Sequence, residues 1–185
     1  MPLYYFIQGK FYLRIDLLGE GAKWRRTTGQ EIYSPLLVAF SEQDGGNWVN
    51  SHVPKFSATE SYCLPENVAL ITLQALDDES VLLRLAHLYE LDEDKDLSKM
   101  ATVDLRKLFP DKMISKITET NLSANQERSE MEKKRLKWKV RGTSRSKSVV
   151  RGRPVDSSKL LVELGPMEIR TFLLNFLDAR RQVVD

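Results

Sequence analysis

Large apolar residues alternate with polar ones along much of this chain, and the alternation predicts a series of β-strands. The clearest signal is a pair of runs, residues 67–76 and 81–90, joined by the polar segment Asp77-Asp78-Glu79-Ser80. Two strands with a short polar connection are typical of a β-hairpin. Both faces of the second run are largely apolar, which indicates a strand that is covered on both sides.

Six further segments carry a similar alternation. They span residues 11–17, 101–109, 113–120, 135–141, 160–164 and 167–174. Pro166 separates the last two and predicts an edge, a bulge or a break in pairing, because proline has no amide hydrogen to give to a strand ladder. Strands at this spacing, with no long helix between them, predict an all-β fold, an antiparallel β-sandwich.

Two segments do not fit the strand pattern. Residues 24–35 are predicted to form an irregular loop, because Pro35 disfavours a helix that runs through Ser34. Residues 124–134 begin with a sequence that resembles a capping box, but Met131 alone forms the apolar face of the helix. Burial cannot hold such a helix, so a loop or a marginal helix is predicted there.

Composition places the chain among globular proteins and leaves its compartment open. Its 185 residues are 42% hydrophobic and 29% charged, which suits one domain, or one domain and part of another. No apolar run approaches the roughly 20 residues that a membrane helix needs. The first residues lack the basic region and cleavage site of a signal peptide. The single cysteine, Cys63, excludes an internal disulfide bond and fits either a reducing compartment or a chain whose partner thiol lies elsewhere.

Positive charge is concentrated in one segment, although the net charge of the chain is only +2. Residues 131–153 hold ten Lys or Arg and one Glu. Such a block attracts polyanions, and Trp138 inside it offers an aromatic face for stacking. However, Trp138 falls on the apolar side of the alternating segment 135–141, which favours a place in the core. A solvated charge run is the preferred interpretation, and nucleic-acid binding is not expected.

The sequence contains no recognised catalytic or metal-binding motif. The two histidines, His52 and His87, are 35 residues apart and belong to no zinc motif. His87 falls on an apolar strand face, which favours a hydrogen-bonded core residue over a ligand. Catalysis by paired carboxyl groups needs two of them roughly 5 Å apart, whereas most acidic residues here sit in solvated runs. Glu168 is the exception, and a structural role beside Arg170 or Arg84 is expected for it.

Aromatic residues and arginines supply candidates for binding, since together they recognise sugars, carboxylates or a neighbouring domain. The candidates for contact with a sugar or with another module are Trp24, Arg25, Arg26, Tyr33 and Trp48. Trp48 and Tyr62 are the candidates for an exposed aromatic platform. Asn121-Leu122-Ser123 fits the acceptor sequence for N-glycosylation, which matters only in the secretory pathway.

Several segments, in order along the chain, are similar to one known family. Among them are Gly21-Ala22-Lys23-Trp24-Arg25-Arg26, Leu83-Arg84-Leu85-Ala86-His87-Leu88-Tyr89 and Pro166-Met167-Glu168-Ile169-Arg170-Thr171-Phe172. They resemble the C-terminal region of the family 38 α-mannosidases of lysosomal or vacuolar type, and most of all the plant members. The similarity runs from about Ile7 to Phe176 and is absent from the two ends.

The resemblance implies a domain plan. Family members are zinc-dependent retaining α-mannosidases whose active site lies in an N-terminal α/β domain, followed by β-sandwich modules. On this plan residues 1–62 are the end of a preceding β module, and residues 63–176 are the C-terminal β-sandwich with a flexible basic loop at 142–153. Residues 177–185 are a tail. The metal ligands, the nucleophile and the acid/base residue of the family have no counterpart in the chain, so no cofactor is expected in it.

The function implied is that of a truncated, non-catalytic C-terminal portion of an enzyme that hydrolyses α-mannosidic bonds in N-glycans and oligomannosides. The isolated chain is predicted to be inactive, with the missing catalytic module or a carbohydrate as its partner and no membrane association. A weak carbohydrate-binding module is the alternative, and a polyanion-binding protein is less favoured. The parent family is lysosomal, vacuolar or secretory, yet no signal peptide is seen here, so the localisation stays open.

Overall fold

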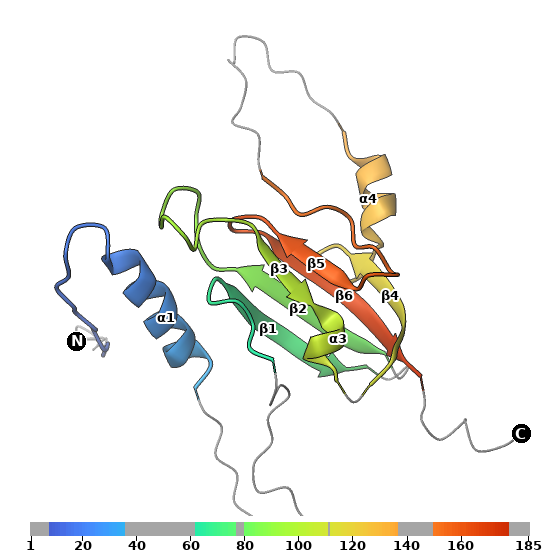
Figure 1. The fold of residues 1–185 in the computed structure, drawn as a ribbon, viewed down its shortest axis with the longest axis horizontal. Helices are drawn as coiled ribbons and strands as arrows, with labels where there is room; N and C mark the ends of the chain where they lie inside the picture. The colour runs from blue at the N-terminus through green and yellow to red at the C-terminus, as the bar shows by residue number, and fades with distance from the viewer. Residues whose placement is uncertain (1–7, 36–61, 77–79, 111, 137–149, 178–185) are drawn as a thin grey trace, which may run out of the picture. The chain divides into compact units, whose positions relative to one another are not determined.

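The computed structural model describes residues 8–35, 62–76, 80–110, 112–136 and 150–177. The chain divides into two compact units, Met1–Pro35 and Leu36–Asp185. The first unit contains helix α1 (Gly21–Tyr33), and the second contains all of the described strands (Figure 1).

Helix α1 occupies the segment in which a loop was predicted, so that prediction is wrong. Pro35 restricts the backbone of Ser34, and Ser34 (φ -130°, ψ 63°) already lies outside the last helical turn. The Ser34 amide closes that turn by donating to the carbonyl oxygen of Gln30 at 2.8 Å. Proline therefore fixes where the helix ends and does not prevent it.

Residues 11–17 do not form the predicted strand. Their large apolar side chains Phe11, Leu13 and Ile15 are exposed, and none of the described strands pairs with them. Alternation marks a segment that is able to join a sheet, but a strand exists only where a neighbour completes its hydrogen-bond ladder.

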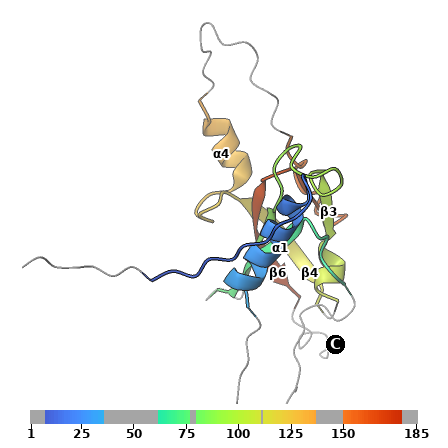
Figure 2. The same cartoon turned by 90° about the vertical axis from the view of Figure 1, so that its left-hand side faces the viewer.

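The second unit is built from two antiparallel sheets. The larger has the strand order β1-β2-β6-β4, where β1 is Val68–Ala75, β2 is Val81–His87, β6 is Ile169–Phe176 and β4 is Ile114–Thr120. The smaller is the pair β3 (Ala101–Asp104) and β5 (Leu161–Leu164). Figures 1 and 2 together place this pair over one face of the larger sheet. The prediction of an antiparallel, all-β sandwich is confirmed.

The core fills the space between the two sheets. It includes Leu83 and Leu85 of β2, Phe172 of β6, Val103 of β3 and Val162 of β5, all with no solvent exposure. Side chains of a strand alternate between its two faces, so every second residue of these strands points into the core. Leu82 on the opposite face of β2 is buried as well, whereas Arg84 and Ala86 on that face are half-buried, so the second face of this strand is covered only in part.

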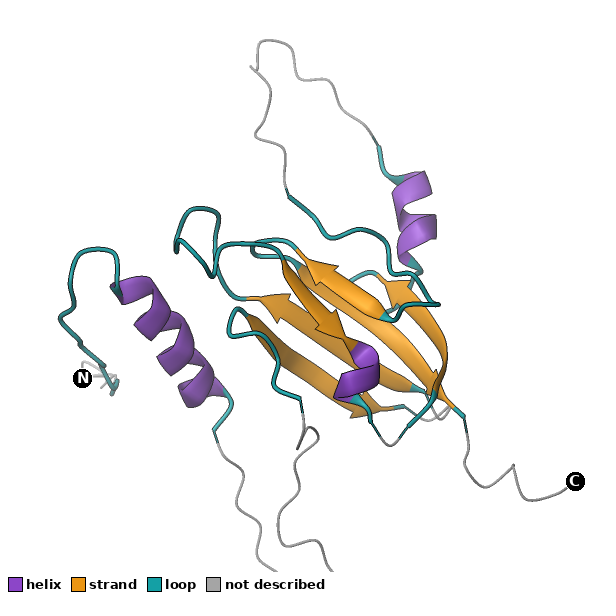
Figure 3. Cartoon of the chain, viewed as in Figure 1, coloured by secondary structure: helices purple, strands orange, loops and turns teal. Residues whose placement is uncertain are grey.

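The remaining elements are short (Figure 3). The predicted strand 101–109 ends at Asp104, whose carboxylate accepts the Arg106 amide and begins helix α3 (Leu105–Leu108). Helix α4 (Arg128–Lys134) contains no buried residue, which confirms the marginal helix.

The two strands on either side of Pro166, β5 and β6, belong to different sheets, which confirms the break in pairing. Of the predicted strand 135–141, only residues 135 and 136 are described, and neither is in a strand; the rest, with Trp138, lies outside the described residues. None of the described helices has the length and apolarity to cross a membrane.

Candidate functional site

Four of the candidate contact residues lie on helix α1. Trp24 and Tyr33 are nine positions apart, which at about 100° per residue places them on roughly opposite sides of the helix. Arg26 and Tyr33 are seven positions apart and share one side. The structure therefore does not bring Trp24 and Tyr33 together as one aromatic surface, and Trp48 lies outside the described residues. Their role in contacts stays a prediction.

Tyr62 belongs to the sandwich and not to an exposed platform. Its ring packs against the core, and its hydroxyl oxygen accepts a hydrogen bond from the Asp104 amide at 3.2 Å. The suggestion that Tyr62 offers a free face to sugars is wrong, because its ring contacts the core and its hydroxyl group bonds to β3.

His87 is a buried, hydrogen-bonded residue, as predicted. Its Nε2 lies 2.8 Å from the carbonyl oxygen of Lys99, and its Nδ1 lies 3.1 Å from that of Tyr89. The Asn67 amide also contacts Nε2, at 3.2 Å. These contacts tie the loop that follows β2 to the sheet. Within the described ranges no three His, Cys, Asp or Glu side chains are placed to hold a metal ion, so these residues do not fit a zinc site.

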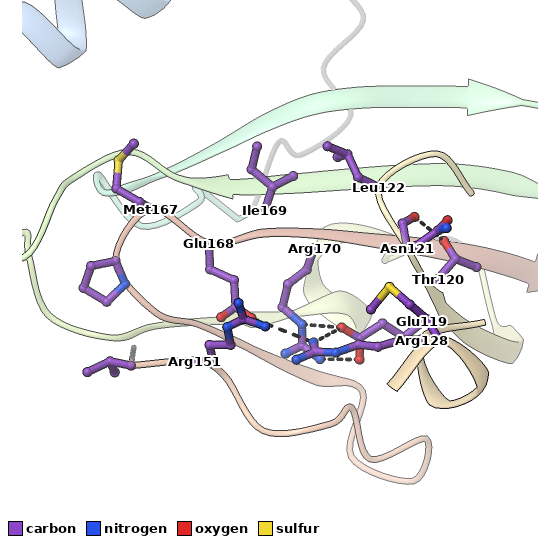
Figure 4. Close-up of a pocket in the computed structure, with 13 residues that line it drawn as sticks. Glu119, Thr120, Asn121, Leu122, Arg128, Arg151, Met167, Glu168, Ile169 and Arg170 are labelled. Carbon is purple, nitrogen blue, oxygen red and sulfur yellow. Dashed lines mark hydrogen bonds and ion pairs between the residues drawn. The ribbon is translucent and has the colours of Figure 1, made fainter. Parts of the chain in front are cut away.

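The most distinctive polar feature is a charge cluster formed by Glu119, Arg128, Glu168 and Arg170 (Figure 4). Glu119 lies on β4, Arg170 on β6, Arg128 at the start of α4 and Glu168 in the turn before β6. Arg170 donates from Nε and Nη2 to the two carboxylate oxygens of Glu119, at 2.7 and 2.6 Å. Arg128 donates to the same carboxylate at 2.5 Å and lies 3.8 Å from the carboxylate of Glu168.

The charge cluster is largely removed from solvent. The side chains of Arg170 and Glu119 are 1% and 8% exposed. The remaining guanidinium nitrogen of Arg170, Nη1, donates to the carbonyl oxygen of Glu163 at 2.7 Å. Burial lowers the pKa of Arg128, but hydrogen bonds to Glu119 and Glu132 outweigh it and hold that pKa above its ordinary value. Complete pairing of this kind is what lets buried charges persist in a folded domain.

Glu168 has different partners from those predicted. Its carboxylate accepts the amides of Gly152 at 2.7 Å and Gly165 at 3.0 Å. The guanidinium of Arg170 is already paired with Glu119. Arg84 lies opposite Thr171 in the register of β2 and β6, so the side chain of Arg84 is on the other face of the sheet from that of Arg170. The expectation of a structural role is confirmed, but Arg170 and Arg84 as its partners were wrong.

The central member of the charge cluster, Glu119, was missed in the sequence. A usable signal exists, because Glu119 shares a strand face with Ile117, and Arg170 shares one with Phe172 and Leu174. A charge at the apolar positions of a strand requires an opposite charge nearby, since an unpaired one would be expelled. An acidic residue and an arginine that each occupy an apolar position of a strand are therefore expected to form an ion pair with each other.

A surface hollow of about 340 Å³ adjoins the charge cluster. Its wall includes Met131, Val150, Met167 and Ile169, and no aromatic residue is among those that line it. Among the residues that the structure describes, the hollow therefore offers no aromatic face to a sugar ring. The two carboxylates that line it, of Glu119 and Glu168, bond to arginines and backbone amides.

Asn121 lies at the edge of the same hollow. Its amide nitrogen donates to Oδ1 of Asn125 at 2.6 Å, and its Oδ1 accepts the Asn125 amide at 3.2 Å. A glycan on Asn121 would be attached to this same amide nitrogen. Glycosylation at this position stays a prediction.

The sandwich matches one known domain family. Residues 67–172, from just before β1 into β6, match the sequence model of the glycosyl hydrolases family 38 C-terminal beta sandwich domain. The chain belongs to glycosyl hydrolase family 38. This membership confirms the family indicated by the sequence segments.

Curated relatives of the family 38 chain are α-mannosidases. It is 61% identical over 180 residues to an α-mannosidase of Arabidopsis thaliana and 52% over 172 residues to that of Canavalia ensiformis. It is 34% identical over 174 residues to the lysosomal α-mannosidase of Homo sapiens. The alignments cover 97%, 92% and 91% of this chain but only 18%, 17% and 16% of the relatives. The chain thus spans about a sixth of the length of the proteins it matches.

Proposed function

We propose that this chain is a non-catalytic β-sandwich module that packs against the remainder of a family 38 α-mannosidase and has no mannosidase activity by itself. The observation that carries the proposal is the match of residues 67–172 to the C-terminal sandwich domain within relatives about six times longer. The whole polypeptide would hydrolyse α-mannosidic bonds, with zinc held by residues outside the matched segment.

The described polar residues support this role. The acidic residues of the charge cluster are held by Arg128, Arg170 and backbone amides, so they stabilise the sandwich and are not free for proton transfer. The described residues that line the hollow beside them include no aromatic side chain, which disfavours the alternative of a carbohydrate-binding module. Most of the basic block 131–153 lies outside the described residues, so binding of polyanions by it stays a less favoured prediction.

The test is an assay of the purified 185-residue chain with an aryl α-mannoside and added zinc. The α-mannosidase of Canavalia ensiformis serves as the positive control at equal molar concentration. No turnover above the zinc-containing buffer is expected from the isolated chain. Zinc-dependent turnover that follows the chain through purification would refute the proposal. In parallel, titration with mannose oligomers should leave its tryptophan fluorescence unchanged, and saturable quenching would favour the carbohydrate-binding module instead.

A further inference from the structure

The two outer strands of the four-stranded sheet differ in how they are protected. In the order β1-β2-β6-β4, strands β1 and β4 are outermost among the described strands. Strand β4 carries Lys116 and Glu119, and helix α4 follows it, with Arg128 bonded back to Glu119. Charged residues and a covering element are the usual means by which a sheet edge is kept from pairing with another chain.

Strand β1 lacks the charged residues that β4 carries. Its sequence, Val-Ala-Leu-Ile-Thr-Leu-Gln-Ala, contains no charged residue, no proline and no glycine. Ile71 and Leu73 are 50% and 43% exposed, although both are large and apolar. An uncharged edge of this length with exposed apolar side chains is typical of a strand that is paired in the complete protein.

The register between β1 and β2 shows which backbone amides of β1 point away from β2. An irregularity lies between Leu70 and Thr72, and from there Thr72–Ala75 pair regularly with Arg84–Val81. The Leu76 amide donates to Ser80 across the hairpin at 2.8 Å, so Leu76 and Ser80 form a hydrogen-bonded pair. Because such pairs alternate along an antiparallel ladder, Gln74 and Thr72 also bond to β2. The amides of Leu73 and Ala75 therefore point away from β2, toward the outer edge.

We propose that this outer edge of β1, over Thr72–Ala75, accepts an extended strand from the part of the α-mannosidase polypeptide that lies outside the matched segment. The relatives supply this partner, because more than four-fifths of their length lies beyond the region that the chain covers. The incoming strand would bond to the amides of Leu73 and Ala75. It would place an apolar residue beside Leu73, on the core side of the sheet, and polar residues beside Thr72 and Gln74.

This inference rests on the proposed function, since it names the surface by which the module joins the larger enzyme. The test compares amide hydrogen exchange in the isolated 185-residue chain with exchange in a chimera. In the chimera, this chain replaces the aligned segment of the Canavalia ensiformis α-mannosidase. We expect the Leu73 and Ala75 amides to exchange rapidly in the isolated chain and on the order of 100-fold more slowly in the chimera, while the inward Gln74 amide is slow in both.

Two outcomes overturn the inference. If the amides of Leu73 and Ala75 are protected in the isolated chain, the edge of β1 is already covered by residues of this chain or by a second copy of it. Equally rapid exchange in both proteins would leave the edge uncovered in the enzyme. If the chimera does not accumulate, exchange at the aligned strand of the native Canavalia enzyme decides the question. A lack of protection there refutes the pairing but leaves the proposed function intact, because that function is judged by the activity of the isolated chain.

Proline substitutions in the same strand give a matched pair of variants. Ala75→Pro removes an outward amide, so it should leave the urea midpoint of the isolated chain nearly unchanged and abolish protection of Leu73 in the chimera. Gln74→Pro removes an inward amide and should destabilise the isolated chain itself. If Ala75→Pro leaves the protection in the chimera intact, Leu73 is covered by something other than a paired strand, and the inference fails.

Discussion

Replacement of Glu119 by glutamine is the sharpest perturbation that the sandwich offers. Glu119 receives three hydrogen bonds from two arginines, at 2.5, 2.6 and 2.7 Å, and its side chain is 8% exposed. Glutamine is nearly the same size, but it has one acceptor oxygen in place of two, carries no charge and turns an amide donor toward a guanidinium. Arg170, which is 1% exposed, would remain buried without its counter-charge.

The expected loss follows from these contacts. Removing one partner of a buried ion pair typically costs about 3–5 kcal/mol, since the other charge stays desolvated. Glutamine retains part of the hydrogen bonding, so we expect a loss near the lower end, about 3 kcal/mol. A domain of this size has about 5–15 kcal/mol of stability in total, so Glu119→Gln should be strongly destabilised.

The assay is urea unfolding at pH 7, followed by far-ultraviolet circular dichroism, with the free energy extrapolated to water. Glu132→Gln is the matched control, because Glu132 also bonds to Arg128 but is 49% exposed, and its loss should stay below about 1 kcal/mol. The double variant Glu119→Met with Arg170→Met removes both charges and should recover much of the stability. Equal effects of Glu119→Gln and Glu132→Gln would refute the reasoning that burial gives the charge cluster its importance.

Three further predictions concern other contacts of the domain. The Arg153 guanidinium lowers the pKa of Glu163 to about 2, against 4.5 for a free glutamate, so this stabilisation is present above pH 4.5 and is lost as the pH falls toward 2. Glu163→Gln should therefore unfold at lower urea than the parent at pH 7, with the midpoints converging at low pH; a constant gap would contradict this. Gly152→Ala puts a Cβ 1.9 Å from the carbonyl oxygen of Glu163 and should lower the melting temperature by several degrees, whereas Gly29→Ala, with open space in α1, should not. Thr171→Val should leave urea stability unchanged or raise it by up to about 1 kcal/mol, because the buried hydroxyl has no described hydrogen-bond partner; a clear loss would reveal one.

The strands that the sequence predicted correctly are those that pair with at least one neighbouring strand. The hairpin of β1 and β2 and the strands β4, β5 and β6 all show period-two alternation, and each lies beside another strand that makes the pattern effective. Residues 11–17 carry a comparable alternation but have no described partner strand. Pairing is a long-range property, so alternation in one segment cannot report whether a neighbour exists.

The errors at helix α1 and in the charge cluster have local physical reasons. At α1, the effect of Pro35 was assigned to the whole segment, although proline constrains chiefly the one residue before it. In the charge cluster, the place of Glu168 after Pro166 makes it stand out in the sequence, whereas Glu119 is the acid that bonds to two arginines. Which acid meets which arginine depends on the strand register, and register becomes visible only in three dimensions.

The contacts of Arg128 and Gly152 fix two points of the chain between α4 and β5 to the sandwich. Arg128 donates to Glu119, and the Gly152 amide donates to Glu168, so both points are held by residues that lie outside the segment between them. Lengthening a connection between two fixed ends costs only about 0.6 kcal/mol for each doubling of its length. A fluorescent reporter or an affinity tag inserted there should leave the sandwich folded and allow the module to be followed in living cells.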